Sequence, residues 1–352
     1  MKNLKSFIKR GFFWSISRSR TYRLLQPFLG GVGIILMFHR VLPEARRSRF
    51  AMNRNIEISS DTLEKVIDLF KGAEFDFVSM DECRNRILGK DRVKRRCVAF
   101  TFDDGYLDNY EHAYPILRRH EIPFAIYVSS KFPNRQMPTW WYALEQLVLE
   151  RDQIAFHLND RAYNYSCSTI KEKHATFSSI HHLILLAGDK VVYDQLLKEV
   201  FSDWDGDVCN CRGALPMSWE HIVELSKDEL VEIGAHTMSH VPLTCQSEGD
   251  ARSEIQQSKE YLEEKIGSPI LHFAYPYGMH GKRDREIVKE SGLLTATTTW
   301  PGNLHHAHRH SLETLPRVAI TDEALEGDYL NLMISGVRPF VDNSFAKVMR
   351  FD

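Results

Sequence analysis

The chain has 352 residues, of which 43% are hydrophobic and 26% are charged, and its formal net charge is −2. This length allows one barrel-sized domain with an insertion, or two domains. The balanced charge excludes the extended basic face that a nucleic-acid partner requires. Six scattered cysteines are too few for a disulfide scaffold and favour a reducing compartment.

Residues 1–30 are expected to form a basic amphipathic leader. No acidic residue precedes Glu44, whereas lysines and arginines accumulate before residue 24. Leu4, Ile8 and Phe12 recur at helical spacing, which favours an amphipathic helix. Such a helix either rests on an anionic membrane face or packs against the rest of the domain, and the composition supports both interpretations equally.

The apolar run at 28–38 is too short to span a bilayer and contains three glycines. It also begins too late for a secretory signal, and no small-residue cleavage pattern accompanies it. The sequence therefore predicts a cytoplasmic location, with peripheral contact to the inner membrane face through the leader as an extension of that prediction.

Beyond the leader, strands and amphipathic helices alternate along the chain. Apolar runs predict strands at 33–38, 75–78, 97–102 and 123–128. Helical periodicity predicts one helix that begins after a cap at 59–61 and two further helices, at 80–88 and 109–120. The alternation resumes later with helices at 219–225, 251–266 and 283–291 and strands at 231–235, 271–275, 293–298 and 315–320.

Residues 150–215 interrupt this pattern. Their polar, histidine-rich segments contain no strand signal as strong as the preceding ones, so we predict a mostly helical insertion there. Elsewhere strand and helix alternate some seven times, which predicts an α/β fold, a distorted parallel (β/α) barrel of about seven strands rather than an open sheet. The barrel is expected to cover residues 31–345, with the insertion at about 150–215.

Two adjacent carboxylates, Asp103 and Asp104, follow the strand at 97–102 and precede a glycine. Carboxylates this close repel each other, so a positive group must keep both ionised or one must take up a proton. Barrel active sites are built just past the carboxyl ends of the strands, which is where this pair lies.

A second strand, at 231–235, ends directly before His236 and His240. Histidines four residues apart lie on one face of a helical turn and can share a cation. Together with one aspartate they would leave coordination sites open for water and substrate. Zinc, cobalt, nickel and iron all tolerate such a ligand set.

The motifs Thr-Phe-Asp-Asp-Gly-Tyr at 101–106, His-x-x-x-His at 236–240 and Phe-Ala-Tyr-Pro-Tyr-Gly at 273–278 together resemble the polysaccharide deacetylases, which share the NodB homology domain of carbohydrate esterase family 4. The resemblance covers most of the chain outside the leader and the insertion. Trp140-Trp141 and Leu-Pro-Arg-Val at 315–318 are similar to the family's chitooligosaccharide-deacetylase-like members. The implied activity is removal of N-acetyl groups from N-acetylhexosamine units of a poly- or oligosaccharide.

The resemblance also implies roles for individual residues. Asp104, His236 and His240 would hold one divalent metal, with zinc preferred, and Asp103 would be the general base. The metal would lower the pKa of bound water and polarise the acetyl carbonyl, and the free carboxylate would take the water's proton. The backbone N–H of Tyr277 would contribute to the oxyanion hole.

Two positions depart from the family pattern. Many members carry an arginine that steers the base where this chain has Ala274, so we expect Arg317 to supply that guanidinium; the alternative is a plain ion pair with Glu313 or another acid. The usual general-acid histidine is also missing after Leu315. His39 is its expected replacement, because the first and last strands of a barrel are neighbours. A histidine after the first strand can then take the same place, and some members of the family look circularly permuted in this way. The alternative for this histidine is that it only caps a buried strand.

Substrate contacts are expected from Tyr106, Trp140, Trp141, Trp219 and Pro276. Tryptophans stack on sugar rings at glycan sites, but at helix starts they also serve as core residues, and both interpretations stay open. Two other functions compete with deacetylation: a related amidohydrolase or O-acetyl esterase on this fold, and a glycan-binding protein without catalysis. The expected partner is an N-acetylated glycan.

Overall fold

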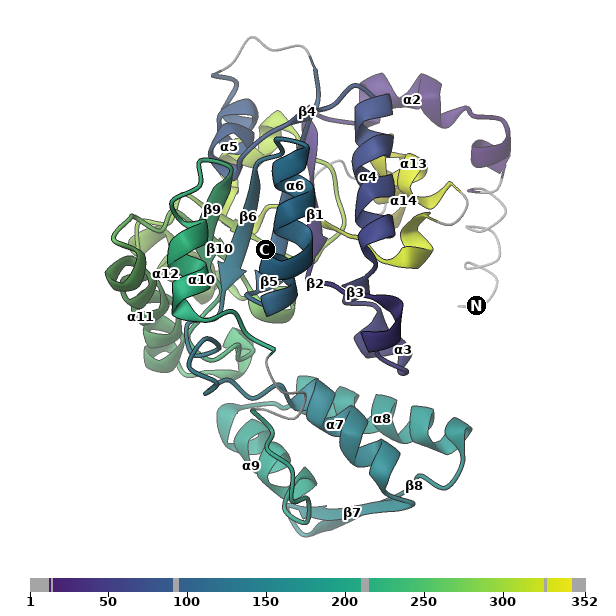
Figure 1. The fold of residues 1–352 in the computed structure, drawn as a ribbon, viewed down its shortest axis with the longest axis vertical. Helices are drawn as coiled ribbons and strands as arrows, with labels where there is room; N and C mark the ends of the chain where they lie inside the picture. The colour runs from purple at the N-terminus through teal and green to yellow at the C-terminus, as the bar shows by residue number, and fades with distance from the viewer. Residues whose placement is uncertain (1–12, 14, 91–94, 210–214, 326–327, 344–352) are drawn as a thin grey trace.

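The computed structural model describes residues 13, 15–90, 95–209, 215–325 and 328–343 (Figure 1). A parallel sheet curls into a barrel with helices packed around it, which confirms the predicted fold class. Its strands are β1 (Gly33–Phe38), β4 (Asp76–Phe77), β5 (Cys97–Asp104), β6 (Phe124–Val128), β9 (Val231–Ala235), β10 (His272–Ala274), β11 (Thr295–Thr297) and β12 (Val318–Ala319).

The main path of the sheet runs β11-β10-β9-β6-β5-β1-β12, with every pairing parallel. The short strand β4 pairs with the beginning of β5. The first strand, β1, therefore lies between β5 and the last strand, β12. Leu315 forms a parallel bridge with Thr297 of β11, so the chain just before β12 brings the two ends of the sheet together.

Strand β5 lies inside this sheet and carries the two adjacent aspartates to its rim. All eight of its residues are buried, as expected for a parallel strand covered on both faces, and this explains its continuous apolar run. Phe100 and Phe102 stack against Phe38 of β1, with ring centroids 5.4 and 5.0 Å apart. The aspartates are thus attached to a strand that packing holds firmly.

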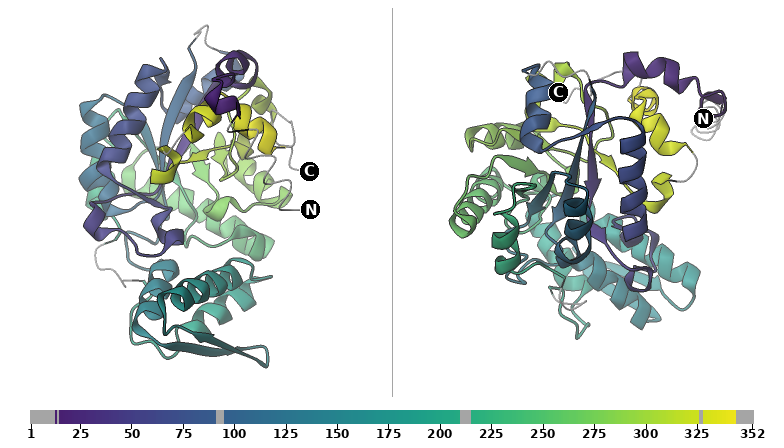
Figure 2. Two further views of the ribbon diagram at one scale, coloured as in Figure 1. Left: turned by 90° about the vertical axis from the view of Figure 1, so that its right-hand side faces the viewer. Right: turned by 45° about the horizontal axis from the view of Figure 1, so that its top comes forward.

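Helices cover the outside of the barrel (Figures 1 and 2). Several begin at a serine whose hydroxyl accepts a backbone N–H of the first turn, as Ser59 does from Thr62. The helices that cover the barrel are α4 (Ser60–Gly72), α5 (Met80–Leu88), α6 (Tyr114–Arg119), α10 (Trp219–Leu225), α11 (Glu248–Ile266) and α12 (Lys282–Glu290). The helix predicted at 109–120 is divided, because a π-helical turn at Asn109–Ala113 precedes α6.

A separate lobe below the barrel in Figure 1 contains the insertion. It consists of α7 (Trp140–Glu150), an antiparallel hairpin of β7 (Gln153–Leu158) and β8 (Arg161–Ser166), α8 (Ile170–Leu185) and α9 (Lys190–Val200). The hairpin was not predicted. Strand β7 buries only every second residue, so its signal is an alternation rather than a continuous apolar run.

One described helix near the beginning of the chain and two near its end lie together on one side of the barrel (Figure 2). Tyr22 of α2 (Tyr22–Leu29) packs with Leu332 of α13 (Tyr329–Ile334) and Val337 of α14 (Val337–Asp342). The amphipathic repeat predicted at residues 4–12 lies outside the described residues. Among the helices that are described, none combines the length and the apolar composition that a membrane span requires.

Candidate active site

Asp104 is directed into the mouth of the barrel by an unusual backbone turn. It ends β5 with φ 75°, and Gly105 follows with φ 94°. Left-handed backbone is uncommon for an aspartate, and consecutive residues in this region bend the chain sharply at the end of the strand. A side chain at Gly105 would be strained by its φ and would meet Val128 at 3.3 Å, so glycine suits the position.

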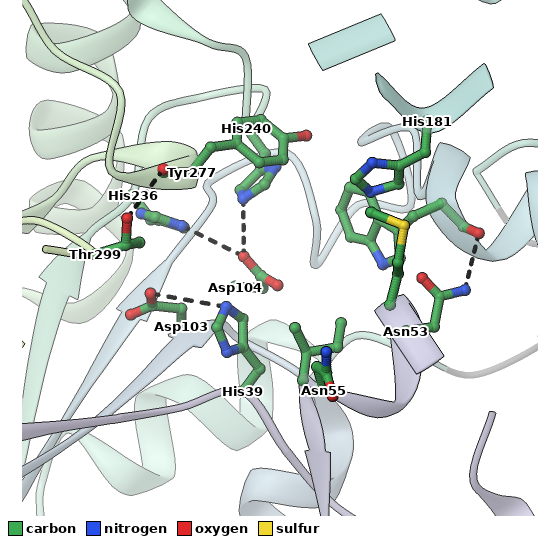
Figure 3. Close-up of a pocket in the computed structure, with 13 residues that line it drawn as sticks. His39, Asn53, Asn55, Asp103, Asp104, His181, His236, His240, Tyr277 and Thr299 are labelled. Atoms are coloured by element: carbon green, nitrogen blue, oxygen red, sulfur yellow. Dashed lines mark hydrogen bonds and ion pairs between the residues drawn. The ribbon is translucent and has the colours of Figure 1, made fainter. Parts of the chain in front are cut away.

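The register of the sheet brings the two histidines to the same level. Asp104 and Ala235 both pair with Val128 of β6, and His236 follows Ala235 directly. Oδ1 of Asp104 lies 3.4 Å from Nε2 of His236 and 3.1 Å from Nε2 of His240 (Figure 3). One ligand atom from each of the three residues therefore converges within 4.8 Å, in buried surroundings.

The chemistry of this group fits a divalent cation. Nδ1 of His236 lies 2.7 Å from the carbonyl oxygen of Ala274, so Nδ1 carries the proton and Nε2 turns a lone pair toward Asp104. A lone pair facing a carboxylate is repelled unless a cation or a proton lies between them. Burial lowers the pKa of His236, but Asp104 and Asp103 raise it above its usual value, so the site favours positive charge.

Asp103 faces a different partner from that of Asp104. Its Oδ1 accepts from Nη1 of Arg317 at 2.7 Å and its Oδ2 from Nη2 at 2.6 Å, a two-pronged ion pair out of contact with solvent. Burial would raise the pKa of Asp103, but Arg317 and His236 hold it below its usual value. The carboxylate therefore stays ionised beside the metal-ligand group without belonging to it.

Arg317 reaches Asp103 from just before β12. Its Nε donates to the carbonyl oxygen of Thr298 at 3.0 Å, and Nη1 also donates to Oγ1 of Thr101 at 3.1 Å. Glu313, the alternative partner considered from the sequence, is paired with Lys289 at 2.8 Å instead. A buried, fully bonded guanidinium holds one orientation, and here that orientation serves the carboxylate of Asp103.

His39 follows β1, and its ring faces Asp103 (Figure 3). Its Nε2 is 4.0 Å from Oδ2 of Asp103, and 19% of its side chain is exposed. The carbonyl oxygen of His39 accepts from Nδ2 of Asn109 at 2.7 Å, which ties this end of β1 to the π-helical turn. Burial lowers the pKa of His39, and the charges of Asp103 and Asp104 oppose that effect.

Tyr277 lies in a strained turn at the edge of the same site. Its φ of 57° and ψ of 6° are left-handed, and its ring packs edge-on against His240 with centroids 4.7 Å apart. Gly278 is also left-handed, and a Cβ there would lie 2.2 Å from Oγ1 of Thr299. That hydroxyl donates to the carbonyl oxygen of Tyr277 at 3.2 Å, so the peptide is held in one direction.

These side chains surround a cavity of about 270 Å³. The sequence had indicated the barrel side of this cavity but not its other walls. Residues that line it without having been predicted are Met52, Asn53, Asn55, Ile56, His181 and Thr299. The first four belong to or follow α3 (Ala51–Arg54), and His181 belongs to the insertion; neither segment carries a motif that could have revealed its position.

Comparison with known proteins identifies the family. The family model described as Polysaccharide deacetylase matches residues 90–296, which is more than half of the chain. The chain belongs to the polysaccharide deacetylase family. This match confirms the resemblance inferred from the motifs.

Solved structures of similar fold were also found. The chain superposes on the Streptococcus pyogenes deacetylase PplD, solved in complex with acetate, with a TM-score of 0.55 and 17% identity over 86% of this chain and 97% of that one. IcaB from Ammonifex degensii gives a TM-score of 0.53 and 20% identity over 87% of this chain and 98% of its own. At such low identity these likenesses show the fold alone.

A curated relative matches a shorter stretch. YxkH of Bacillus subtilis (strain 168) is 47% identical over 40 residues, which cover 11% of this chain and 14% of the relative. A match of this extent carries no conclusion about the activity or the substrate of the whole protein.

Of the aromatic residues predicted to contact substrate, Trp141 lines the cavity. Trp140 is fully buried and donates from Nε1 to the hydroxyl oxygen of Tyr277 at 3.2 Å, so it supports the site from behind. Tyr106 and Pro276 are also buried, outside the cavity lining. Trp219 lies on α10 and packs edge-on against Tyr261, and the structure does not bring it to the cavity either.

A second possible ligand group is formed by Asp81, Glu232 and His272, whose ligand atoms also lie within 4.8 Å. The Glu232 carboxylate already accepts the backbone N–H groups of Met80 and Asp81 at 2.6 and 3.1 Å, at the beginning of α5. A helix N-terminus is positive and disfavours a cation. We therefore interpret this group as a helix cap with a neighbouring histidine.

Proposed function

We propose that this chain removes N-acetyl groups from N-acetylhexosamine units of a poly- or oligosaccharide, using one divalent metal. The observation that carries the proposal is the convergence of Asp104, His236 and His240 on one point, beside an ionised Asp103 that belongs to a separate ion pair. Membership of the polysaccharide deacetylase family supports the substrate class.

In this proposal Asp104, His236 and His240 hold the metal, and the nitrogen and oxygen ligands favour zinc, with cobalt, nickel or iron tolerated. When bound, the metal lowers the pKa of water and polarises a carbonyl oxygen. Asp103 accepts the proton of the attacking water, because a carboxylate oxygen bonded to Arg317 still has a second lone pair. Arg317 keeps this carboxylate ionised and correctly directed.

His39 is proposed to protonate the leaving amine. Its Nε2 lies 4.0 Å from Oδ2 of Asp103, and its side chain is partly exposed and lines the same cavity. An imidazole can both hold and release a proton near neutral pH, which suits this step. The N–H of Tyr277, directed by its left-handed backbone, is proposed to donate to the acetyl carbonyl oxygen, which becomes negatively charged when water attacks the acetyl carbon.

The expected result for the purified protein is about one bound metal per chain and release of acetate from tetra-N-acetylchitotetraose. Chelation should abolish acetate release, and added zinc or cobalt should restore it. Asp104→Asn should lose metal and activity together, because an amide is a poor replacement for an anionic ligand. Metal content and acetate are measured on the same samples.

Other outcomes would favour the competing functions. A protein with bound metal but no acetate release from this oligosaccharide would be a related amidohydrolase or an O-acetyl esterase, which other amides and esters would identify. A protein that takes up no metal but binds the oligosaccharide would be a glycan-binding protein.

We also propose that the leader meets an anionic membrane surface. Leu24 and Phe28, four residues apart on α2, are 74% and 70% exposed, although the other side of α2 packs on the end of the chain. Arg20 and Arg23 are exposed beside them, so apolar and basic groups face outward together. The cytoplasmic location, at the inner membrane face, stays a prediction from the sequence.

Replacing Leu24 and Phe28 together by serine should weaken binding to phosphatidylglycerol vesicles by at least about tenfold, since each apolar side chain transferred from water contributes roughly 1.5–3 kcal/mol. Co-sedimentation measures this change. Val191→Ser on α9 is the matched control, because Val191 is also 74% exposed but lies in the insertion. Equal vesicle binding by the double variant and the control would contradict the proposed membrane contact.

A further inference from the structure

The cavity beside the metal-ligand group lies between two parts of the chain (Figure 3). The barrel contributes the acid–base and ligand residues, and the lobe that contains the insertion contributes Trp141 from α7 and His181 from α8. Its volume of about 270 Å³ is at the small end for ligand pockets, which span roughly 300–1,000 Å³. Such a space suits one sugar ring with its acetyl group.

The insertion is held firmly against the barrel at this place. Nδ2 of Asn53, on α3, donates to the carbonyl oxygen of Trp141 at 3.0 Å and to Oε2 of Glu145 at 2.7 Å. The hydroxyl of Tyr142 donates to Oε1 of Glu57 at 2.7 Å. These bonds are buried and bind α7 to the segment after β1, so the wall of the cavity has a defined position.

Two polar atoms of this wall are buried without a hydrogen-bond partner among the described residues: Nε1 of Trp141 and Nδ1 of His181. Leaving such a group unpaired costs roughly 1–3 kcal/mol. Neither is needed for the proposed metal site or for the proton transfers. A ligand that bonds to both atoms would satisfy them, as would an ordered water.

Both rings are held in place by packing. His181 lies against Trp140 and Phe177, with ring centroids 4.9 and 5.7 Å apart. Trp141 lies against His240 at 5.3 Å and against Trp140 at 5.7 Å. Their polar atoms therefore have fixed directions before any ligand arrives, which lowers the entropy lost on binding.

We propose that the insertion supplies a sugar-binding subsite in which His181, with Trp141, hydrogen-bonds an uncharged hydroxyl or amide group of the hexosamine whose acetyl group faces the barrel residues. This inference rests on the proposed deacetylase function and adds the residue that selects the sugar.

The protonation state of His181 supports the choice of an uncharged group. Burial, reinforced by the neighbouring His182, lowers the pKa of His181 to about 4. The imidazole is then neutral at physiological pH, so it has no positive charge with which to attract a carboxylate or a phosphate. A neutral ring nitrogen pairs well with a hydroxyl or an amide.

The test compares His181→Ala with His182→Ala, a matched control because His182 is the next residue on α8 and is exposed. With tetra-N-acetylchitotetraose, His181→Ala should raise KM by about tenfold, the size of one lost hydrogen bond, while kcat stays close to that of the unchanged protein. With 4-nitrophenyl acetate, which carries an acetyl ester but no sugar, the loss in His181→Ala should be much smaller than with the oligosaccharide. His181→Asn, which keeps a polar atom close to the position of Nδ1, should recover part of the lost affinity.

An unchanged KM in His181→Ala would overturn the subsite, and so would an equal loss with 4-nitrophenyl acetate, because the residue would then act on the chemistry or on folding. If the unchanged protein releases no acetate, the proposed function fails instead. The subsite is then judged by calorimetric titration of the same oligosaccharide: weaker binding by His181→Ala than by His182→Ala supports it, and equal or absent binding overturns it.

Discussion

Replacing Asp103 by asparagine is expected to lower kcat for acetate release by about 10³-fold, within the range for loss of a general base. The bound metal should remain, because both Asp103 oxygens face Arg317 and the ligand atoms belong to Asp104 and the two histidines. An amide still accepts a hydrogen bond from Arg317 but cannot take up the proton of water. Steady-state kinetics and metal analysis of the same preparation check the prediction.

His39→Ala is the companion variant, since Asp103 is proposed to accept the proton of water and His39 to protonate the leaving amine. It should also keep its metal and lose about 10²-fold or more in kcat, the lower end of the range for an acid catalyst. If Asp103→Asn lost its metal as Asp104→Asn does, the division of roles between the adjacent aspartates would be wrong. Unchanged kinetics in His39→Ala would leave this histidine with a structural role only.

Replacing Arg317 by alanine is expected to lower the free energy of unfolding by about 3–5 kcal/mol, because it leaves a buried carboxylate without its partner. Arg317 is fully buried and makes four hydrogen bonds, to Thr298, Thr101 and both oxygens of Asp103. Urea denaturation at neutral pH measures the loss. Lys289→Ala, which removes the partly exposed pair with Glu313, is the control and should cost about 1 kcal/mol or less.

The pH dependence of this loss follows from the pKa of Asp103. In the unchanged protein that pKa lies below its usual value, so the stability from the pair is present above about pH 4 and is lost as pH falls through the lowered pKa. In Arg317→Ala the unpaired carboxyl is expected to have a raised pKa, so this variant should lose stability as pH rises. This account would be contradicted if the difference in free energy of unfolding between the unchanged protein and Arg317→Ala did not grow between pH 5 and pH 8.

The barrel was predictable because its strands and helices carry local signals. The continuous apolar run of β5, the serine that caps α4 and the periodic residues of α10 each depend on a few neighbours in the chain, and the structure places all three elements where the sequence predicted them. The hairpin β7–β8 was missed because a half-buried strand signals only by alternation, which polar surroundings obscure. The short helices α13 and α14 were also missed.

The residues of the candidate site also fall into two groups, those that local sequence signals predicted and those that they did not. The carboxylates at the end of β5 and the histidines after β9 follow strands directly, so the sequence by itself determined where they lie and which chemistry they suit. The sequence pointed to Arg317 and His39 only through the resemblance to the family, and the tertiary structure supplied their contacts with Asp103: an ion pair from Arg317, and His39 at 4.0 Å. That His181 closes the cavity was decided by the tertiary structure alone. The physical reason is that barrel closure and docking of the insertion bring together residues more than 60 positions apart, and no local spacing in the chain records which side chains then meet.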